Sequence, residues 1–322
     1  MINLKLFQSK NLSLVSNILS KVNIKLLITF ICLAFVGTSI YGNSEPLSKL
    51  TIDLKETLWL VLGLLFSFLS IIINAYAWKL LINSLGCNSN KLNIIKIFLS
   101  THIYKYLPGG VWHFVSRYNI LRLEFSNQKS VESILLEPLL MLVAGLIFVP
   151  FRNFNIYFSL ACWSSALVFL PGLREFIIKR MIEMKAKIFD NSDNRINDRN
   201  AIQNTKYISS KIFYPFKSLF VEIIFILFRF FGFYCCINAF SIGAFIPYGE
   251  LISSFSLAWI IGLIVPAAPG GLGVFESTIL FSLGSQLPEA PLLASLLCYR
   301  LVSTFSDIFA ALLYPAKRLL RF

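Results

Sequence analysis

The sequence has 322 residues, of which 57% are hydrophobic and 14% charged, with a mean hydropathy of +0.73 and a formal net charge of +13. Soluble domains carry about 25% charged residues, so this composition excludes a soluble globular protein. The basic excess does not point to nucleic acid, because bases gather in cytoplasmic loops and beside anionic lipid headgroups. Several apolar runs reach the ~20 residues of a spanning helix, which predicts an all-α polytopic membrane protein.

In chain order, the sequence predicts two membrane repeats with six spanning helices. A polar, basic segment at 1–23 precedes the first repeat, at 24–171. Its expected spans are 24–41, 57–82, 131–150 and 156–170. A basic linker at 172–212 leads to the second repeat, at 213–322, with expected spans at 217–241 and 291–314.

Each repeat also contains two apolar limbs that are too short to span. The limbs at 92–107 and 111–123 hold 16 and 13 residues, which is roughly 24 and 20 Å of helix against a ~30 Å hydrocarbon core. They also carry charges, at Lys96, Lys105, Arg117 and Arg122. These features favour a re-entrant helical hairpin at 92–123, and a similar one at 251–286. An amphipathic surface helix followed by a loop is the alternative for the first.

The distribution of basic residues predicts the orientation. Residues 172–217 contain ten basic and five acidic residues, which places this segment in the cytoplasm. With six spans, both termini also lie inside, and the base-poor loops 42–56, 151–155 and 242–250 lie outside. We therefore expect a multi-pass protein of the plasma (inner) membrane with cytoplasmic N- and C-termini.

The two hairpins share a Pro-Gly-Gly triplet, and the two triplets lie half a chain length apart. They are Pro108, Gly109 and Gly110 in the first hairpin, and Pro269, Gly270 and Gly271 in the second. In the predicted topology the hairpins enter from opposite sides, as in an inverted repeat, which would place a substrate between them near the midplane. Free amides at a helix start suit an anion such as phosphate. A tight turn between packed helices is the alternative.

Charged residues inside apolar helices are the candidate substrate-binding residues, because such charges are costly in lipid. Arg300, Ser303, Thr304 and Asp307 form one polar stripe at i, i+3, i+4 and i+7. This stripe either lines a substrate path or supplies an Arg300–Asp307 or interhelix pair that holds the bundle.

Five further charged residues extend this set. Glu222 and Arg229 share a helix face, although Glu222 could instead lie at the membrane interface. Arg117 could bind a lipid phosphate bidentately, or extend to the cytoplasmic headgroups. Glu137 and Glu276 could partner these arginines, and Glu276 could also cap amides at its helix start.

The sequence predicts no catalytic residue, cofactor or metal site. The six cysteines contain no CxxC pair and are interpreted as small packing residues. The two histidines, His102 and His113, have no acidic cluster beside them.

Two stretches resemble a known family. Lys105-Tyr-Leu-Pro-Gly-Gly-Val-Trp-His-Phe-Val-Ser-Arg117 and Pro269-Gly-Gly-Leu-Gly-Val-Phe-Glu276 are similar to motifs of the lysylphosphatidylglycerol synthase transmembrane region, also called flippase-like integral membrane proteins. Tyr299-Arg300 also resembles the family pattern, and the resemblance covers roughly residues 20–318.

The resemblance implies a flippase or transporter for an anionic or lipid-linked substrate, either a phospholipid or a polyprenyl phosphate. The full synthases carry a soluble catalytic domain after the membrane region. No such domain follows here, so aminoacyl transfer is not expected. The expected partners are membrane lipids, with no nucleic acid, and a homo-oligomer is a further option. The alternatives are a membrane-embedded transferase acting on a lipid-linked sugar, and an accessory subunit of an envelope-synthesis complex.

Overall fold

The computed structural model describes residues 37–38, 41, 53–88, 92–106, 111–152, 155–170, 172–173, 176, 214–265 and 273–313. Every regular element in this part of the chain is helical, which confirms the all-α class. The helices of the first half are α4 (Leu54–Ser84), α5 (Ile94–His102), η1 (Ile103–Tyr106), α6 (Trp112–Leu121), α7 (Asn127–Leu146), η2 (Val149–Arg152), α8 (Ile156–Ser164) and η3 (Ser165–Phe169). Those of the second half are α11 (Phe216–Ala239), η4 (Gly243–Phe245), α12 (Tyr248–Ile264), α13 (Val274–Leu283) and α14 (Glu289–Leu313).

Four of the six predicted spans are confirmed as helices long and apolar enough to cross a membrane. They are α4, α7 with its η2 extension, α11 and α14, with 31, 26, 24 and 25 residues. The predicted span at 24–41 lies almost wholly outside the described residues. The span expected at 156–170 is a shorter apolar helix, Ile156–Phe169. The count of six spans is therefore not confirmed.

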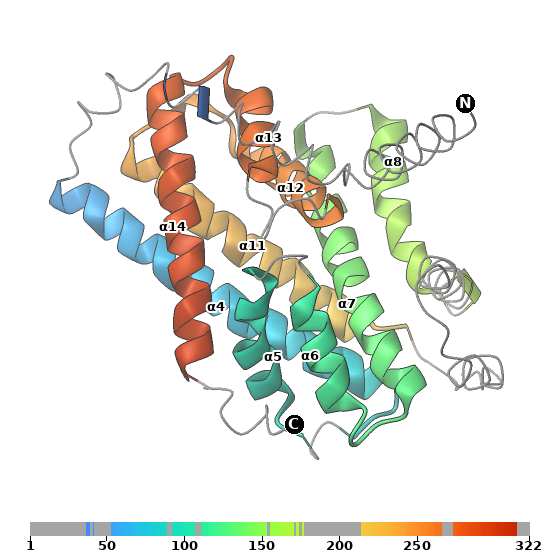
Figure 1. The fold of residues 1–322 in the computed structure, drawn as a ribbon. Coiled ribbons are helices and arrows are strands. Elements are labelled where there is room, and N and C mark those ends of the chain that lie inside the picture. Colours follow the sequence, from blue (N-terminus) through green and yellow to red (C-terminus); the bar gives the residue numbers. More distant parts are fainter. Residues whose placement is uncertain are drawn as a thin grey trace, which may run out of the picture.

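Both predicted hairpins consist of short helices that pack on one another. In the first, α5 packs on α6, and in the second, α12 packs on α13. Figure 1 shows the two pairs near opposite ends of the crossing helices α11 and α14. In the first limb, α5 lies against α4 and α14 and buries Ile97, Phe98 and Leu99, and the choice between a re-entrant hairpin and a membrane-surface helix stays open. Re-entry from one side of a membrane and the inverted repeat stay predictions.

Polar side chains fix where several of these helices begin. Asn93 accepts a hydrogen bond from the Lys96 amide at the start of α5 (3.1 Å), and Asn155 accepts one from the Tyr157 amide at the start of α8 (3.1 Å). Such caps satisfy amides that have no partner within the helix. The starts of the short helices are thus specified locally in the sequence.

The two helices that make the largest contact, α4 and α11, approach each other through small residues. A Cβ atom added at Gly232 would overlap the Ser67 hydroxyl and lie 3.3 Å from the Gly63 carbonyl oxygen. Ser218 donates to the Ala77 carbonyl at the other end of the same contact (2.8 Å). Small residues allow this close packing, which drives helix association where lipid provides no hydrophobic force.

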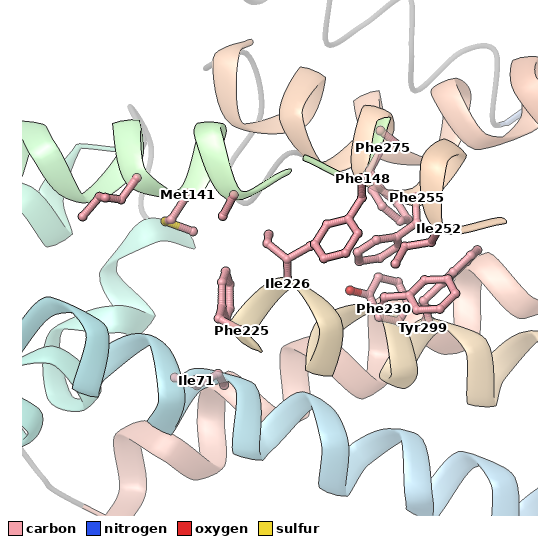
Figure 2. Packing of buried hydrophobic residues seen from close by; sticks show 14 of the residues in the cluster. Ile71, Met141, Phe148, Phe225, Ile226, Phe230, Ile252, Phe255, Phe275 and Tyr299 are labelled. Atoms are coloured by element: carbon pink, nitrogen blue, oxygen red, sulfur yellow. The ribbon is translucent and has the colours of Figure 1, made fainter. Parts of the chain in front are cut away.

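A cluster of aromatic rings joins the second hairpin to α11 and α14. Phe255 of α12 stacks on Phe233 of α11 at 5.4 Å between ring centroids, and Phe275 of α13 lies 5.5 Å from Tyr299 of α14. Figure 2 shows Phe255, Phe275 and Tyr299 near Phe230 and Phe148. Because aromatic pairs favour defined geometries, this cluster fixes the position of α13 relative to α14.

The outer faces of the spanning helices are apolar and exposed. On α14, Leu301, Phe305 and Leu312 are each more than half exposed, whereas Asp307 on the opposite face is fully buried. A soluble protein rarely exposes such a surface, and a lipid bilayer is the environment that suits it. Asp307 therefore lies inside the protein, whereas the exposed apolar side chains of α14 suit contact with lipid.

Candidate functional site

Asp307 is the centre of a buried cluster of polar side chains between α14 and the end of the first hairpin. Its carboxylate is fully buried. Lys105 Nζ lies 2.8 Å from Asp307 Oδ2, and the Tyr106 hydroxyl donates to the same oxygen at 2.6 Å. Both partners belong to η1, which continues α5 directly. The first hairpin is thus attached to α14 at the residues just before its Pro-Gly-Gly triplet.

Two further groups approach the other oxygen of Asp307. His102 Nε2 lies 3.2 Å from Oδ1, and Arg229 Nη2 of α11 lies 3.6 Å from it. The Arg229 guanidinium also stands over the Trp259 ring, 5.6 Å from its centroid. Within the part of the chain that the structure describes, Nε and Nη1 of Arg229 are buried and have no hydrogen-bond partner. Arg229 therefore keeps unused donor capacity.

Burial sets the charge of the hairpin residues, which lie outside the four candidate spans. It lowers the pKa of His102 to about 3, so the imidazole is neutral. It lowers the pKa of Lys105 to about 8, opposed by the attraction of Asp307, so Lys105 remains mostly protonated at neutral pH. Lys105 thus counts as a cation of the cluster and His102 does not.

A second ion pair joins the second hairpin to α14. Arg300 Nε donates to Glu276 Oε1 at 2.6 Å, while Glu276 Oε2 accepts from the Gly273 amide at 2.8 Å. Glu276 therefore both partners an arginine and caps the start of α13, so both sequence predictions for it are confirmed. Gly273 has φ of +82°, a conformation that glycine adopts without strain, which allows the chain to enter α13 here.

These contacts show which partners the charged residues of the α14 stripe have. The expected Arg300–Asp307 pair is wrong, since each residue pairs with a different hairpin. Seven residues separate them, which is roughly 10 Å along a helix and too far for a direct contact. Ser303 and Thr304 lie between them, buried and half-buried respectively. Interhelix pairs therefore join α14 to both hairpins, and the lining of a substrate path by this stripe stays a prediction.

Arg117 lies in a separate ion pair. Its Nη1 donates to both oxygens of Glu137 at 2.8 and 2.6 Å, its Nε donates to Thr101 Oγ1 at 3.2 Å, and its guanidinium stands 3.8 Å from the Phe98 ring centroid. The Arg117 side chain is fully buried, so the alternative that it extends to the headgroups is wrong. The predicted Glu137 partner is confirmed. Substrate binding by either residue stays a prediction.

Glu222 is also inside the protein. Its side chain is 1% exposed, so it faces other helices, and the alternative of a position at the level of the membrane interface stays open. The six triplet residues, Pro108 to Gly110 and Pro269 to Gly271, lie outside the described residues. A site between the two triplets therefore stays a prediction.

Sequence reasoning missed three partners of Asp307: His102, Lys105 and Tyr106. A local signal did exist, because residues at i, i+3 and i+4 lie on one face of a helical turn. Their distant partner on α14 could not be read from that spacing. Among the described residues, no group of three or more His, Cys, Asp or Glu side chains could hold a metal ion.

Residues 4–311 match the family described as the lysylphosphatidylglycerol synthase TM region. The chain belongs to this family. Among curated proteins, none matches the sequence significantly. The family and the four long apolar helices together indicate a multi-pass integral membrane protein of lipid metabolism or transport.

Proposed function

We propose that the protein moves an anionic or lipid-linked substrate across the bilayer, either a phospholipid or a polyprenyl phosphate. The observation that carries the proposal is the buried charge at α14. Three cations, Lys105, Arg229 and Arg300, are accompanied by two anions, Asp307 and Glu276. Among the described residues this leaves one positive charge in excess, and Arg229 is buried among apolar helices, where a charge is stable only with a partner.

An anionic headgroup would supply the missing negative charge. Lys105 lies within electrostatic range of both Arg229 and Arg300, and Arg229 has two nitrogens available to donate. A guanidinium binds phosphate through parallel hydrogen bonds, which makes an arginine with free donors the natural contact for a phosphate headgroup. We therefore assign headgroup binding to Arg229, with Lys105 and Arg300 beside it.

The outer face of α14 would accommodate the acyl or prenyl chain. Leu301, Phe305 and Leu312 are exposed on this helix, while Asp307 lies on its inner face. A substrate with a charged headgroup and an apolar tail could thus place the headgroup inside the bundle and leave the tail in the bilayer. The two hairpins at opposite ends of α11 and α14 would alternately open the headgroup site to each side (Figure 1).

A reconstitution experiment tests the proposal. Purified protein is placed in liposomes that contain a headgroup-labelled phospholipid or a labelled polyprenyl phosphate, and loss of label on addition of an impermeant quencher reports movement between leaflets. We expect one lipid class to move faster than in protein-free liposomes, and Arg229→Met to abolish the increase. If neither class moves faster, the proposal is wrong.

Arg152 offers a matched control for Arg229. It is partly exposed and pairs with Glu250 at 3.0 Å, at the junction of η2 and α12. Arg152→Met removes the same charge without touching the Asp307 cluster, so lipid movement should persist. Equal loss of movement in both variants would show that general misfolding, and not headgroup binding, explains the effect.

A further inference from the structure

Glu222 is a buried carboxyl group that takes part in none of the ion pairs described above. It lies six residues into α11, roughly 9 Å from the helix start. Its side chain is 1% exposed, and among the described residues neither carboxyl oxygen has a hydrogen-bond partner. An ionised carboxylate in such surroundings is strongly disfavoured and becomes neutral by taking up a proton.

The charged groups around Glu222 do not offer it a cation. Its helix packs on α4, α7, α12 and α14. On α7, Glu137 lies within electrostatic range and is paired with Arg117, so it adds negative charge. The remaining charged residues of the packed helices and of α11 itself are Lys55, Glu56, Lys79, Lys129, Glu132, Lys217, Arg229, Glu250, Glu289, Arg300 and Asp307. Of these, Arg229 lies two helical turns away and contacts Asp307.

A hydrogen-bond acceptor for the protonated form lies on the neighbouring helix. Ser218 of α11 contacts Ala77 of α4, and the two helices run antiparallel. Glu222 lies one turn after Ser218 on α11, and Asn74 lies one turn before Ala77 on α4. Because the helices are antiparallel, Glu222 and Asn74 lie at the same height along the α4–α11 interface. Asn74 is 1% exposed, and its Oδ1 atom has no partner among the described residues. A carboxylic acid could donate to such an oxygen, whereas a carboxylate could not.

We propose that Glu222 is a proton-binding site and that its proton is coupled to movement of the anionic headgroup, which rests on the function proposed above. Binding consists of one proton passing from water to a Glu222 carboxylate oxygen, and release returns it. An anion held at Arg229 would stand about 10 Å away along the helix axis. At that separation it would raise the proton affinity of Glu222 on the order of tenfold.

Linkage makes this effect reciprocal. Protonation of Glu222 raises the affinity for the anion by the same factor, so proton and headgroup bind together and leave together. The direction of coupling is therefore co-movement: a proton gradient would pull the anionic lipid in the direction in which protons flow.

The binding claim has a test that does not depend on transport. Infrared spectra of the purified protein at neutral pH should contain the carbonyl stretch of a protonated carboxyl group, and Glu222→Gln should remove it. Glu250→Gln serves as the control, because Glu250 is partly exposed and pairs with Arg152. If the spectra of the wild type and Glu222→Gln do not differ in this band, Glu222 is ionised and the proposal is overturned.

The coupling claim is tested in the lipid-movement assay with a pH difference across the membrane. We expect wild-type movement of an anionic lipid to change several-fold when the pH difference is reversed, and Glu222→Gln, which imitates the protonated state, to lose this dependence. If Glu222→Gln keeps it, coupling through Glu222 is refuted while the proposed function stands. If wild-type protein moves no lipid at all, the proposed function fails and coupling fails with it, and the infrared result still decides whether Glu222 binds a proton.

Discussion

The buried pair of Arg117 and Glu137 gives the sharpest stability prediction. Glu137→Gln keeps the shape of the side chain but removes its negative charge, while Arg117 remains fully buried beside the rings of Phe98 and Trp78. Both Nη1 hydrogen bonds of Arg117 go to Glu137, at 2.8 and 2.6 Å. Removing one partner of a buried pair costs about 3–5 kcal/mol, because the remaining charge has no compensation.

This loss would appear as a fall in Tm on the order of 10 °C for a protein of this size. The measurement is thermal unfolding in nanodiscs, followed by intrinsic fluorescence. Glu132→Gln is the matched control on the same helix: Glu132 is also buried, but it accepts from Gln128 at 3.0 Å and neutralises no buried cation. We expect that variant to cost about 1 kcal/mol or less.

A double variant separates ion pairing from general packing. Arg117→Met with Glu137→Gln removes both charges, so its loss should be much smaller than the sum of the two single losses. Additive losses would refute the reasoning, as would a Glu137→Gln variant with wild-type Tm.

Three further predictions use the same unfolding measurement. Gly232→Ala should lower the free energy of unfolding by about 1–3 kcal/mol, because the added Cβ would overlap the Ser67 hydroxyl. Gly262→Ala is the control: its Cβ would meet nothing within 4 Å, so Tm should be unchanged or slightly raised. Asp307→Asn should cost about 3–5 kcal/mol, because buried cations of the first hairpin and α11 lose their anion; an unchanged Tm would show that another group neutralises them. Glu276→Gln should cost about 1–3 kcal/mol through the lost ion pair yet retain the helix cap, so Glu276→Ala should be less stable by about 1 kcal/mol more. Equal Tm values for the last two variants would contradict the capping role.

Local features of the sequence were enough to predict the all-α fold class and most of the order of long and short helices along the chain. The apolar runs at 57–82, 131–150, 217–241 and 291–314 predicted long helices, because a bilayer requires about 20 apolar residues and little else. The short limbs at 92–123 and 251–286 predicted helices that end at Pro-Gly-Gly, since proline and glycine interrupt a helix locally. The match to a family of membrane proteins confirms the resemblance seen in two short motifs.

The partner of Asp307 and the choice of arginine for each glutamate were decided by the tertiary structure. Helical spacing placed Arg300 and Asp307 on one face, yet Asp307 bonds Tyr106, 201 residues away in sequence, and Arg300 bonds Glu276. Spacing along one helix fixes the face but not the neighbour that packs on it. The same holds for Glu222: the sequence predicted a charged residue within an apolar helix, and only the packing of α4, α7 and α11 showed that it is buried with no hydrogen-bond partner among the described residues.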